Sequence, residues 1–134
     1  MKLITRDTDY ALRSLCYIAR DNKRTVAVSE LVRELKIPRP FLRKILQVLN
    51  KKKILKSRKG IGGGFLLALS ARKIFLVDLI EIFQGEFSLN ECLFKKLSCP
   101  NIKTCCLRKK INRIEGYVMN ELKSISIASL LKKG

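Results

Sequence analysis

The sequence contains no histidine, and only 11 of its 134 residues are acidic. Histidine is the commonest general acid–base group, and no acidic pair in a recognisable motif replaces it, so we expect no enzymatic activity. The apolar runs are shorter than the roughly 18 residues that a membrane span needs. The opening stretch "MKLITRDTDYALR" also lacks the apolar core of a secretory signal. We therefore predict a cytoplasmic protein with no membrane partner.

Basic residues are abundant, and 29 lysines and arginines give a formal net charge of +18. Between residues 36 and 60 they occur without any acidic neighbour, at Lys36, Arg39, Arg43, Lys44, Lys51, Lys52, Lys53, Lys56, Arg58 and Lys59. A solvated basic surface is the alternative, but no acidic residue is present to relieve the repulsion between these charges. The segment therefore favours binding to nucleic acid.

Apolar periodicity predicts a first helix within "DYALRSLCYIARDN", where apolar residues recur at 11, 12, 15, 18 and 19. Asp7 or Thr8 is its expected N-cap. Cys16 lies within this pattern, and we interpret it as a core residue. A short second helix is expected within "AVSELVRELK", with Ser29 as N-cap.

A third helix is expected within "IPRPFLRKILQVLNKKK". Pro38 disfavours helical geometry at the residue before it, and Pro40 suits the first helical position. Two helices joined by a tight break, the second of them basic, are typical of a helix-turn-helix. Lys36 stands where a turn glycine is common.

Two short apolar segments flank "GIGGG" at residues 60–64 and predict a β-hairpin. A phosphate-binding nucleotide loop would need a lysine and a Ser/Thr after its last glycine, whereas Phe65 follows here. A basic hairpin directly after a basic helix instead predicts a DNA-binding wing. Arg58 and Lys59 would reach phosphates or a minor groove.

The C-terminal third predicts a helix that ends at Gly85, then a cysteine-rich segment, then a long helix. In the long helix, apolar residues at 107, 111, 114, 118, 122 and 125 form a stripe that little of the monomer remains to cover, so a second copy is expected to cover it. Gly116 interrupts this helix, and close approach of another helix is its only explanation.

The expected fold is therefore mainly α with a small β-hairpin. Residues 1–85 form a winged helix-turn-helix domain, and residues 86–134 contain the cysteine-rich loop and a dimerisation helix.

Four of the five cysteines fall between residues 92 and 106. Zinc sites usually pair their ligands as C-x2-C, which is absent here, and the adjacent Cys105 and Cys106 would both reach one small ion only with strain. The spacing C-x6-C-x5-C of Cys92, Cys99 and Cys105 suits an iron–sulfur cluster better. Neighbouring lysines favour thiolates. The alternative, that these are buried small apolar residues, stays open, above all for Cys106.

The order of these features resembles the family of winged-helix transcriptional regulators that includes the cluster regulator IscR and the nitric-oxide sensor NsrR. The resemblance covers nearly the whole chain. It depends on "TDYALR", on "IPRPFLRKILQVLNKKKILKSRKGIGGGFLLAL", and on the three cysteines before a long helix. It implies a winged helix that dimerises through its last long helix and controls transcription according to the state of an iron–sulfur cluster.

The resemblance also implies a ligand set. Cys92, Cys99 and Cys105 match the three cluster cysteines, for a 2Fe–2S or 4Fe–4S cluster. In IscR a histidine completes the set, but Arg108 occupies that position and cannot ligate. In NsrR an aspartate of the other subunit's first helix does so, which implies Asp9 from the partner chain. Cys106 is the alternative ligand, and Asp9 is alternatively only an acid that stabilises the helix start.

The DNA contacts implied by the resemblance centre on the third helix and the wing. Arg39 and Arg43 are expected to read guanine edges, and lysines to hold phosphates. The full expected set is Ser29, Arg39, Pro40, Arg43, Lys44, Lys51, Lys52, Arg58, Lys59, Gly62 and Gly63. A homodimer would bind a near-palindromic double-stranded operator, and loss of the cluster would change the spacing of its two recognition helices.

Two other functions fit parts of the sequence. One is a cluster-free regulator whose cysteines sense thiol redox state or bind zinc. The other is an iron–sulfur electron carrier, which would not need the large basic region between residues 36 and 60.

Overall fold

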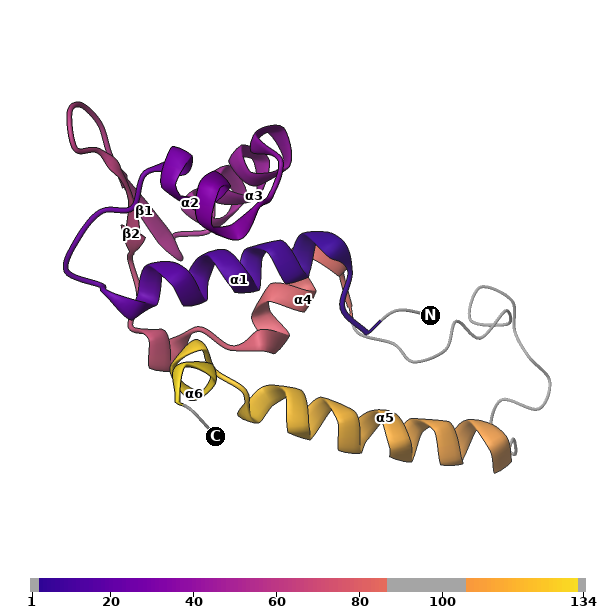
Figure 1. The fold of residues 1–134 in the computed structure, drawn as a ribbon. Coiled ribbons are helices and arrows are strands. Elements are labelled where there is room, and N and C mark those ends of the chain that lie inside the picture. Colours follow the sequence, from indigo (N-terminus) through magenta and orange to yellow (C-terminus); the bar gives the residue numbers. More distant parts are fainter. Residues whose placement is uncertain (1–2, 87–105, 133–134) are drawn as a thin grey trace.

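The computed structural model describes residues 3–86 and 106–132, and within these ranges it is mostly helical with one small hairpin (Figure 1). The elements are α1 (Arg6–Arg20), α2 (Val28–Leu35), α3 (Arg39–Lys51), β1 (Leu55–Arg58), β2 (Gly64–Leu67), the 3-10 helix η1 (Ala71–Lys73), α4 (Leu76–Gln84), α5 (Cys106–Ser124) and α6 (Ile127–Leu131). This confirms the predicted fold class. None of the helices within the described ranges combines the length and the apolar character that crossing a bilayer requires.

The core forms where α1 passes beneath α3 and above α4 and α6 (Figure 1). From α1 it receives Ala11, Leu15 and Ile18, and α3 contributes a fully covered apolar face that consists of Leu42, Ile45, Leu46 and Leu49. Cys16 packs against this core, as predicted, and its burial raises the pKa of its thiol. Burial of these aliphatic side chains is the main source of stability for the α1–α3 unit.

The turn between α2 and α3 has the helix-turn-helix form that the sequence predicts. Lys36 ends α2 in the left-handed conformation, with φ 55°, where glycine would be less strained. Ile37 is buried and anchors the turn, and Pro38 is the N-cap of α3. Arg39 is therefore the first helical residue, so Pro40 occupies the second position and not the first.

The hairpin pairs Leu55 with Leu67 and Arg58 with Gly64 in antiparallel register. A backbone bridge between Val26 and Phe65 attaches this hairpin to the loop before α2, with N–H···O distances of 2.8 and 2.9 Å. A Cβ atom on Gly64 would lie 2.3 Å from the Val26 carbonyl oxygen. Only glycine therefore allows the wing to lie this close to the loop.

Two predicted helix caps are wrong. The N-cap of α1 is Thr5, because the hydroxyl of Thr8 instead donates to the Gln84 side chain at 2.6 Å. The N-cap of α2 is Ala27, and Ser29 lies exposed inside the helix. The bridge at Val26 holds the chain extended up to Ala27, so the helix begins as soon as the chain leaves that bridge.

The expected long C-terminal helix is divided. It ends at Ser124, and Ser126 begins α6 through a capping box with Ser129. Two backbone hydrogen bonds turn the chain back. The Leu76 N–H donates to the Ile125 carbonyl at 2.9 Å, and the Ile127 N–H donates to the Ile74 carbonyl at 2.8 Å. Ile127 is then fully buried in the α1–α3 core. The end of the chain thus helps to build the same core as the N-terminal helices.

Candidate nucleic-acid interface

The outward side of α3 is basic because apolar and charged residues alternate with helical periodicity. Leu42, Ile45, Leu46 and Leu49 face the core, which leaves Arg39, Arg43 and Lys44 exposed. Arg39 and Arg43 are one turn apart and therefore share a face. Lys51 and Lys52 at the end of the helix are exposed as well, and so is Pro40.

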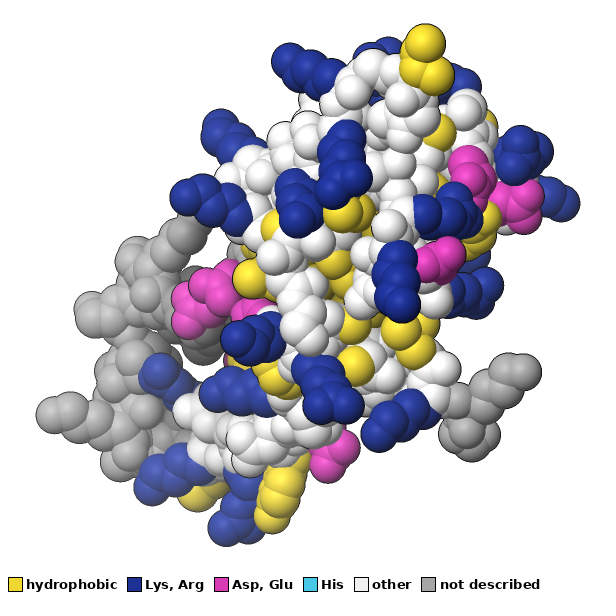
Figure 2. Space-filling view, turned by 90° about the vertical axis from the view of Figure 1, so that its left-hand side faces the viewer, with side chains coloured by type: hydrophobic (Ala, Val, Ile, Leu, Met, Phe, Trp, Pro, Cys, Tyr) yellow, Lys and Arg dark blue, Asp and Glu magenta, His cyan; other side chains and the backbone are white. Residues whose placement is uncertain are grey.

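The wing extends this basic surface. Lys56, Arg58 and Lys59 are all exposed, and no acidic residue occurs anywhere between Glu34 and Asp78. Figure 2 shows lysine and arginine side chains spread over one face of the molecule, with few acidic side chains among them. A surface of this charge attracts the phosphate backbone of a nucleic acid.

The glycines at the tip of the wing have structural roles. Gly62 has φ +74°, and a Cβ atom on Gly63 would lie 2.3 Å from the Arg58 carbonyl oxygen. The Gly63 N–H donates to the Gly60 carbonyl at 3.0 Å and closes a tight turn. The sequence prediction that Gly62 and Gly63 contact DNA stays a prediction, but both residues are required for the turn.

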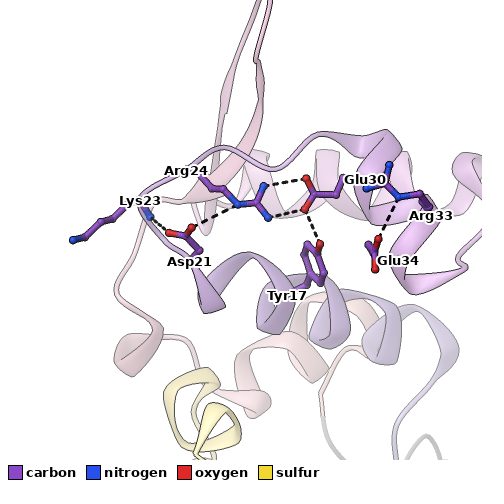
Figure 3. Close-up of polar contacts among 7 residues, drawn as sticks. All are labelled: Tyr17, Asp21, Lys23, Arg24, Glu30, Arg33 and Glu34. Carbon is purple, nitrogen blue, oxygen red and sulfur yellow. Dashed lines mark hydrogen bonds and ion pairs between the residues drawn. The ribbon is translucent and has the colours of Figure 1, made fainter.

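A polar network that sequence analysis missed fixes the loop before α2 (Figure 3). Arg24 donates two hydrogen bonds to the Glu30 carboxylate, at 3.0 and 2.7 Å, and the Tyr17 hydroxyl donates a third at 2.6 Å. The guanidinium and the hydroxyl lower the pKa of Glu30 to about 2. The same carboxylate raises the pKa values of Arg24 and Tyr17. Nothing in the local sequence indicates that these three residues meet.

The loop fixed by this network carries the contacts to the wing. Val26 forms the bridge to Phe65, and the Thr25 hydroxyl donates to the Gly62 carbonyl at 2.7 Å. The network at Glu30 therefore holds the wing against α1 and α2, and so sets its position relative to α3.

The predicted cluster ligands lie mostly outside the described residues. Cys92, Cys99 and Cys105 all fall in the range 87–105. Cys106 is exposed at the first position of α5. Asp9 lies in the first turn of α1 and forms an ion pair with Arg13 at 3.0 Å. Within 3–86 and 106–132, no three histidine, cysteine or acidic residues come together in a way that would hold a metal ion.

A second missed residue is Gln84, at the end of α4. Its side-chain oxygen accepts from the Thr5 N–H at 3.0 Å and from the Thr8 hydroxyl, and its amide donates to the Leu3 carbonyl at 3.1 Å. These bonds join the start of α1, which carries Asp9, to the end of α4. The start of α1 is thereby fixed beside the point where the cysteine segment begins.

Helix α5 extends away from the rest of the described structure and packs on α4 only near its C-terminal end (Figure 1). Leu122 is buried against Leu76 and Ile80. Val118 and Ile125 pack against the same cluster, whereas the N-terminal part of the predicted apolar stripe is exposed, with Leu107 and Ile114 exposed by 68% and 50%. Tyr117, on the same helix, is exposed as well.

Comparison with known proteins agrees with this architecture. The family model of Rrf2, described as an iron-dependent transcriptional regulator, matches residues 4–133. The chain belongs to the Rrf2 family. This Rrf2 protein is therefore a DNA-binding transcriptional regulator.

Relatives of this Rrf2 protein include an HTH-type regulator of Aquifex aeolicus, which is 34% identical over 91% of this chain and 86% of the relative. The HTH-type repressor NsrR of Streptomyces coelicolor is 26% identical over 96% of this chain and 87% of the relative. Among solved structures, CymR, the global cysteine regulator of B. subtilis, is similar with a TM-score of 0.83 and 20% identity over 98% of this chain and 97% of CymR. IscR of T. potens gives a TM-score of 0.76, with 20% identity over 98% and 86%.

Proposed function

We propose that this Rrf2 protein is a homodimeric repressor whose binding to a near-palindromic operator is controlled by a 2Fe–2S or 4Fe–4S cluster. The observation that carries the proposal is the placement of three cysteines, spaced C-x6-C-x5-C, between α4 and a helix whose apolar stripe is exposed at Leu107 and Ile114. A sensor at this place would adjoin both the DNA-binding unit and the helix expected to join two copies.

The expected DNA contacts divide into two kinds. Arg39 and Arg43 extend from the N-terminal half of α3 and are suited to bidentate bonds with guanine. Phosphates would be held by Ser29, Lys44, Lys51, Lys52, Arg58 and Lys59, all of them exposed. Two copies would present two α3 helices to successive major grooves about one helical turn apart.

The donor set fits an iron–sulfur cluster, because three thiolates supply the ligands that such clusters favour. Cys92, Cys99 and Cys105 would hold the cluster, which when bound supplies a centre that reacts with oxidants or nitric oxide. The partner subunit's Asp9 is the proposed fourth ligand, and Cys106 the alternative. Arg13 already pairs with Asp9 at 3.0 Å, so it would orient that carboxylate for ligation.

Ligands taken from both protomers would couple the two subunits. In each protomer Gln84 holds the start of α1 to the end of α4, so the Asp9 that a protomer gives to its partner's cluster would be coupled to the cysteines that follow its own α4. Losing that ligation would change the spacing of the two α3 helices and shift the population between the arrangement that binds the operator and the one that does not.

Anaerobic purification followed by iron and acid-labile sulfide analysis and a visible spectrum tests the cluster. We expect brown protein that contains both elements, and Cys99→Ala should lose them. Cys16→Ala is the matched control, because Cys16 packs against the core and should leave the cluster content unchanged. Colourless protein without iron and sulfide, even after reconstitution, would overturn the proposal. A cluster-free thiol-sensing or zinc-bearing regulator would then take its place.

Asp9→Ala tests the fourth ligand, with Asp7→Ala as its control in the same helical turn. We expect Asp9→Ala to shorten the lifetime of the cluster in air, and Asp7→Ala to leave it unchanged. Equal lifetimes in all three proteins would exclude Asp9, and Cys106→Ala should then be the variant that shortens the lifetime.

A further inference from the structure

The tip of the wing carries a single side chain, and it is apolar. Residues 60–64 read Gly-Ile-Gly-Gly-Gly, so Ile61 alone has a Cβ atom there. Its side chain is fully exposed, and it is the most exposed of the large apolar residues in the described part of the chain. Single exposed apolar residues are common on protein surfaces, so exposure alone would carry no conclusion.

The backbone holds Ile61 in one place. The Gly63 N–H donates to the Gly60 carbonyl at 3.0 Å, which makes Ile61 and Gly62 the central residues of a four-residue turn. Gly62, with φ +74°, supplies the positive φ that a type II turn needs at its third position. The Thr25 hydroxyl then bonds the Gly62 carbonyl at 2.7 Å and fastens the tip to the loop before α2. Ile61 is thus presented outward on a tip that is tied down from within.

The shape and charge of the wing indicate what this side chain contacts. A minor groove is only about 6 Å wide, and a tip made of glycines is slim enough to enter it. Arg58 and Lys59 precede the tip and are exposed, so they would pair with the phosphates on the groove edges. Apolar side chains that enter a minor groove contact sugars and base edges and open flexible base steps.

We propose that Ile61 inserts into the minor groove that flanks the operator half-site and makes binding depend on the deformability of the DNA there. This inference rests on the DNA-binding part of the proposed function and is independent of the cluster. A·T-rich flanks with pyrimidine–purine steps would be favoured, because such steps unstack readily and lack the guanine amino group in the minor groove.

The test begins with duplexes selected by the wild-type protein from a random-sequence library, and it measures affinity over a range of salt concentrations. Ile61→Ser should bind a selected duplex about tenfold more weakly, because a buried isoleucine side chain is lost from the interface. Its dependence on salt should be unchanged, since no phosphate contact is removed. Lys59→Ala should instead make the slope of log affinity against log salt concentration shallower by about one per protomer, because one phosphate contact is lost.

A second duplex, with its flanks changed to G·C pairs, completes the test. Wild-type protein should lose affinity for this duplex, while Ile61→Ser should bind both duplexes equally. Ile61→Leu should restore the wild-type preference. Leu69→Ser, in the chain segment after β2, is the matched control and should retain that preference.

Equal affinity of wild type and Ile61→Ser for both duplexes would overturn the inference. It would also fail if Ile61→Ser changed the oligomeric state, because a second copy would then be the partner of the tip. If the wild-type protein selected no sequence at all, the proposed sequence-specific DNA binding itself would be wrong. That result differs from the one in which wild type selects a sequence and Ile61→Ser binds it equally well.

Discussion

Helices α3 and α5 are both amphipathic, but the described part of the protomer covers only α3 along most of its apolar side. Leu42, Ile45, Leu46 and Leu49 of α3 are buried, and only Phe41 at the start of its apolar side is exposed. In α5 only Leu122 is buried, while Leu107, Ile114 and Tyr117 remain exposed by half or more. Helix α3 is therefore stabilised by packing within one chain. Helix α5 instead presents an exposed apolar surface that a second molecule could cover.

This difference in burial distinguishes a DNA-binding helix from a dimerisation helix, although the two have the same apolar periodicity in the sequence. A helix whose apolar side is covered can offer its polar side to DNA in a fixed orientation, as α3 does with Arg39 and Arg43. A helix whose apolar side is uncovered is suited to join two copies. The comparison can be tested by removing apolar atoms from each helix in turn.

The largest effect is expected for Leu46→Ala in α3. Leu46 is fully buried in the core, so the cavity should lower the free energy of unfolding by about 2–5 kcal/mol. Urea denaturation followed by circular dichroism measures this change. A loss below about 1 kcal/mol would show that α3 is less tightly covered than the structure indicates.

Removing an apolar side chain from α5 should weaken the dimer and leave the stability of the monomer almost unchanged. Ile114→Ser removes an exposed apolar side chain, so the stability of a diluted monomer should hardly change. The proposed dimer should dissociate about tenfold more readily, because an interface along α5 would bury the same side chain between two copies. Sedimentation equilibrium measures the dissociation, and Asn112→Ser on the same helix is the control. Identical dissociation constants for wild type and Ile114→Ser would exclude α5 as the dimer interface.

The apolar residues of α1 and α3 could be predicted from sequence because their periodicity is strong and their charged residues fall on the opposite side. The wing was predictable because a cluster of glycines between two apolar segments has few interpretations other than a turn. The caps at Thr5 and Ala27 were not, since each depends on a residue distant in sequence, Gln84 in one case and Phe65 in the other. Local propensity contains no information about such pairs.

The candidate site divides in the same way. Basic residues of α3 were found because charge is visible in composition, and their exposure follows from the helical period. The network of Tyr17, Arg24 and Glu30 was missed because it joins two helices and a loop, and each residue alone is ordinary. The break after Ser124 was missed because the apolar period continues through it, while backbone bonds to Ile74 and Leu76 turn the chain.

A smaller effect is expected from the network that holds the wing. The pKa of Glu30 is lowered to about 2, so its ionised form stabilises the fold above about pH 4.5, and that contribution is lost as the pH falls from 4.5 toward 2. Glu30→Gln should lower the Tm by a few degrees at pH 7 and reduce the dependence of the Tm on pH in that range. Thermal melts at several pH values measure both, and Glu34→Gln, whose carboxylate is exposed beside Arg33, is the control. An unchanged pH dependence in Glu30→Gln would show that this carboxylate is not linked to folding.

The smallest effect, and the most informative about α5, is expected for Gly116→Ala. A Cβ atom on Gly116 meets none of the described residues within 4 Å, so alanine should stabilise the isolated helix by about 0.5–1 kcal/mol. If a second α5 crosses close to Gly116, the same methyl group would separate the two helices and weaken the dimer. Opposite signs in monomer stability and dimer affinity would therefore place the crossing point at this residue. If both quantities rose together, the two helices would meet along the apolar stripe that carries Ile114, which lies on the opposite side of α5 from Gly116.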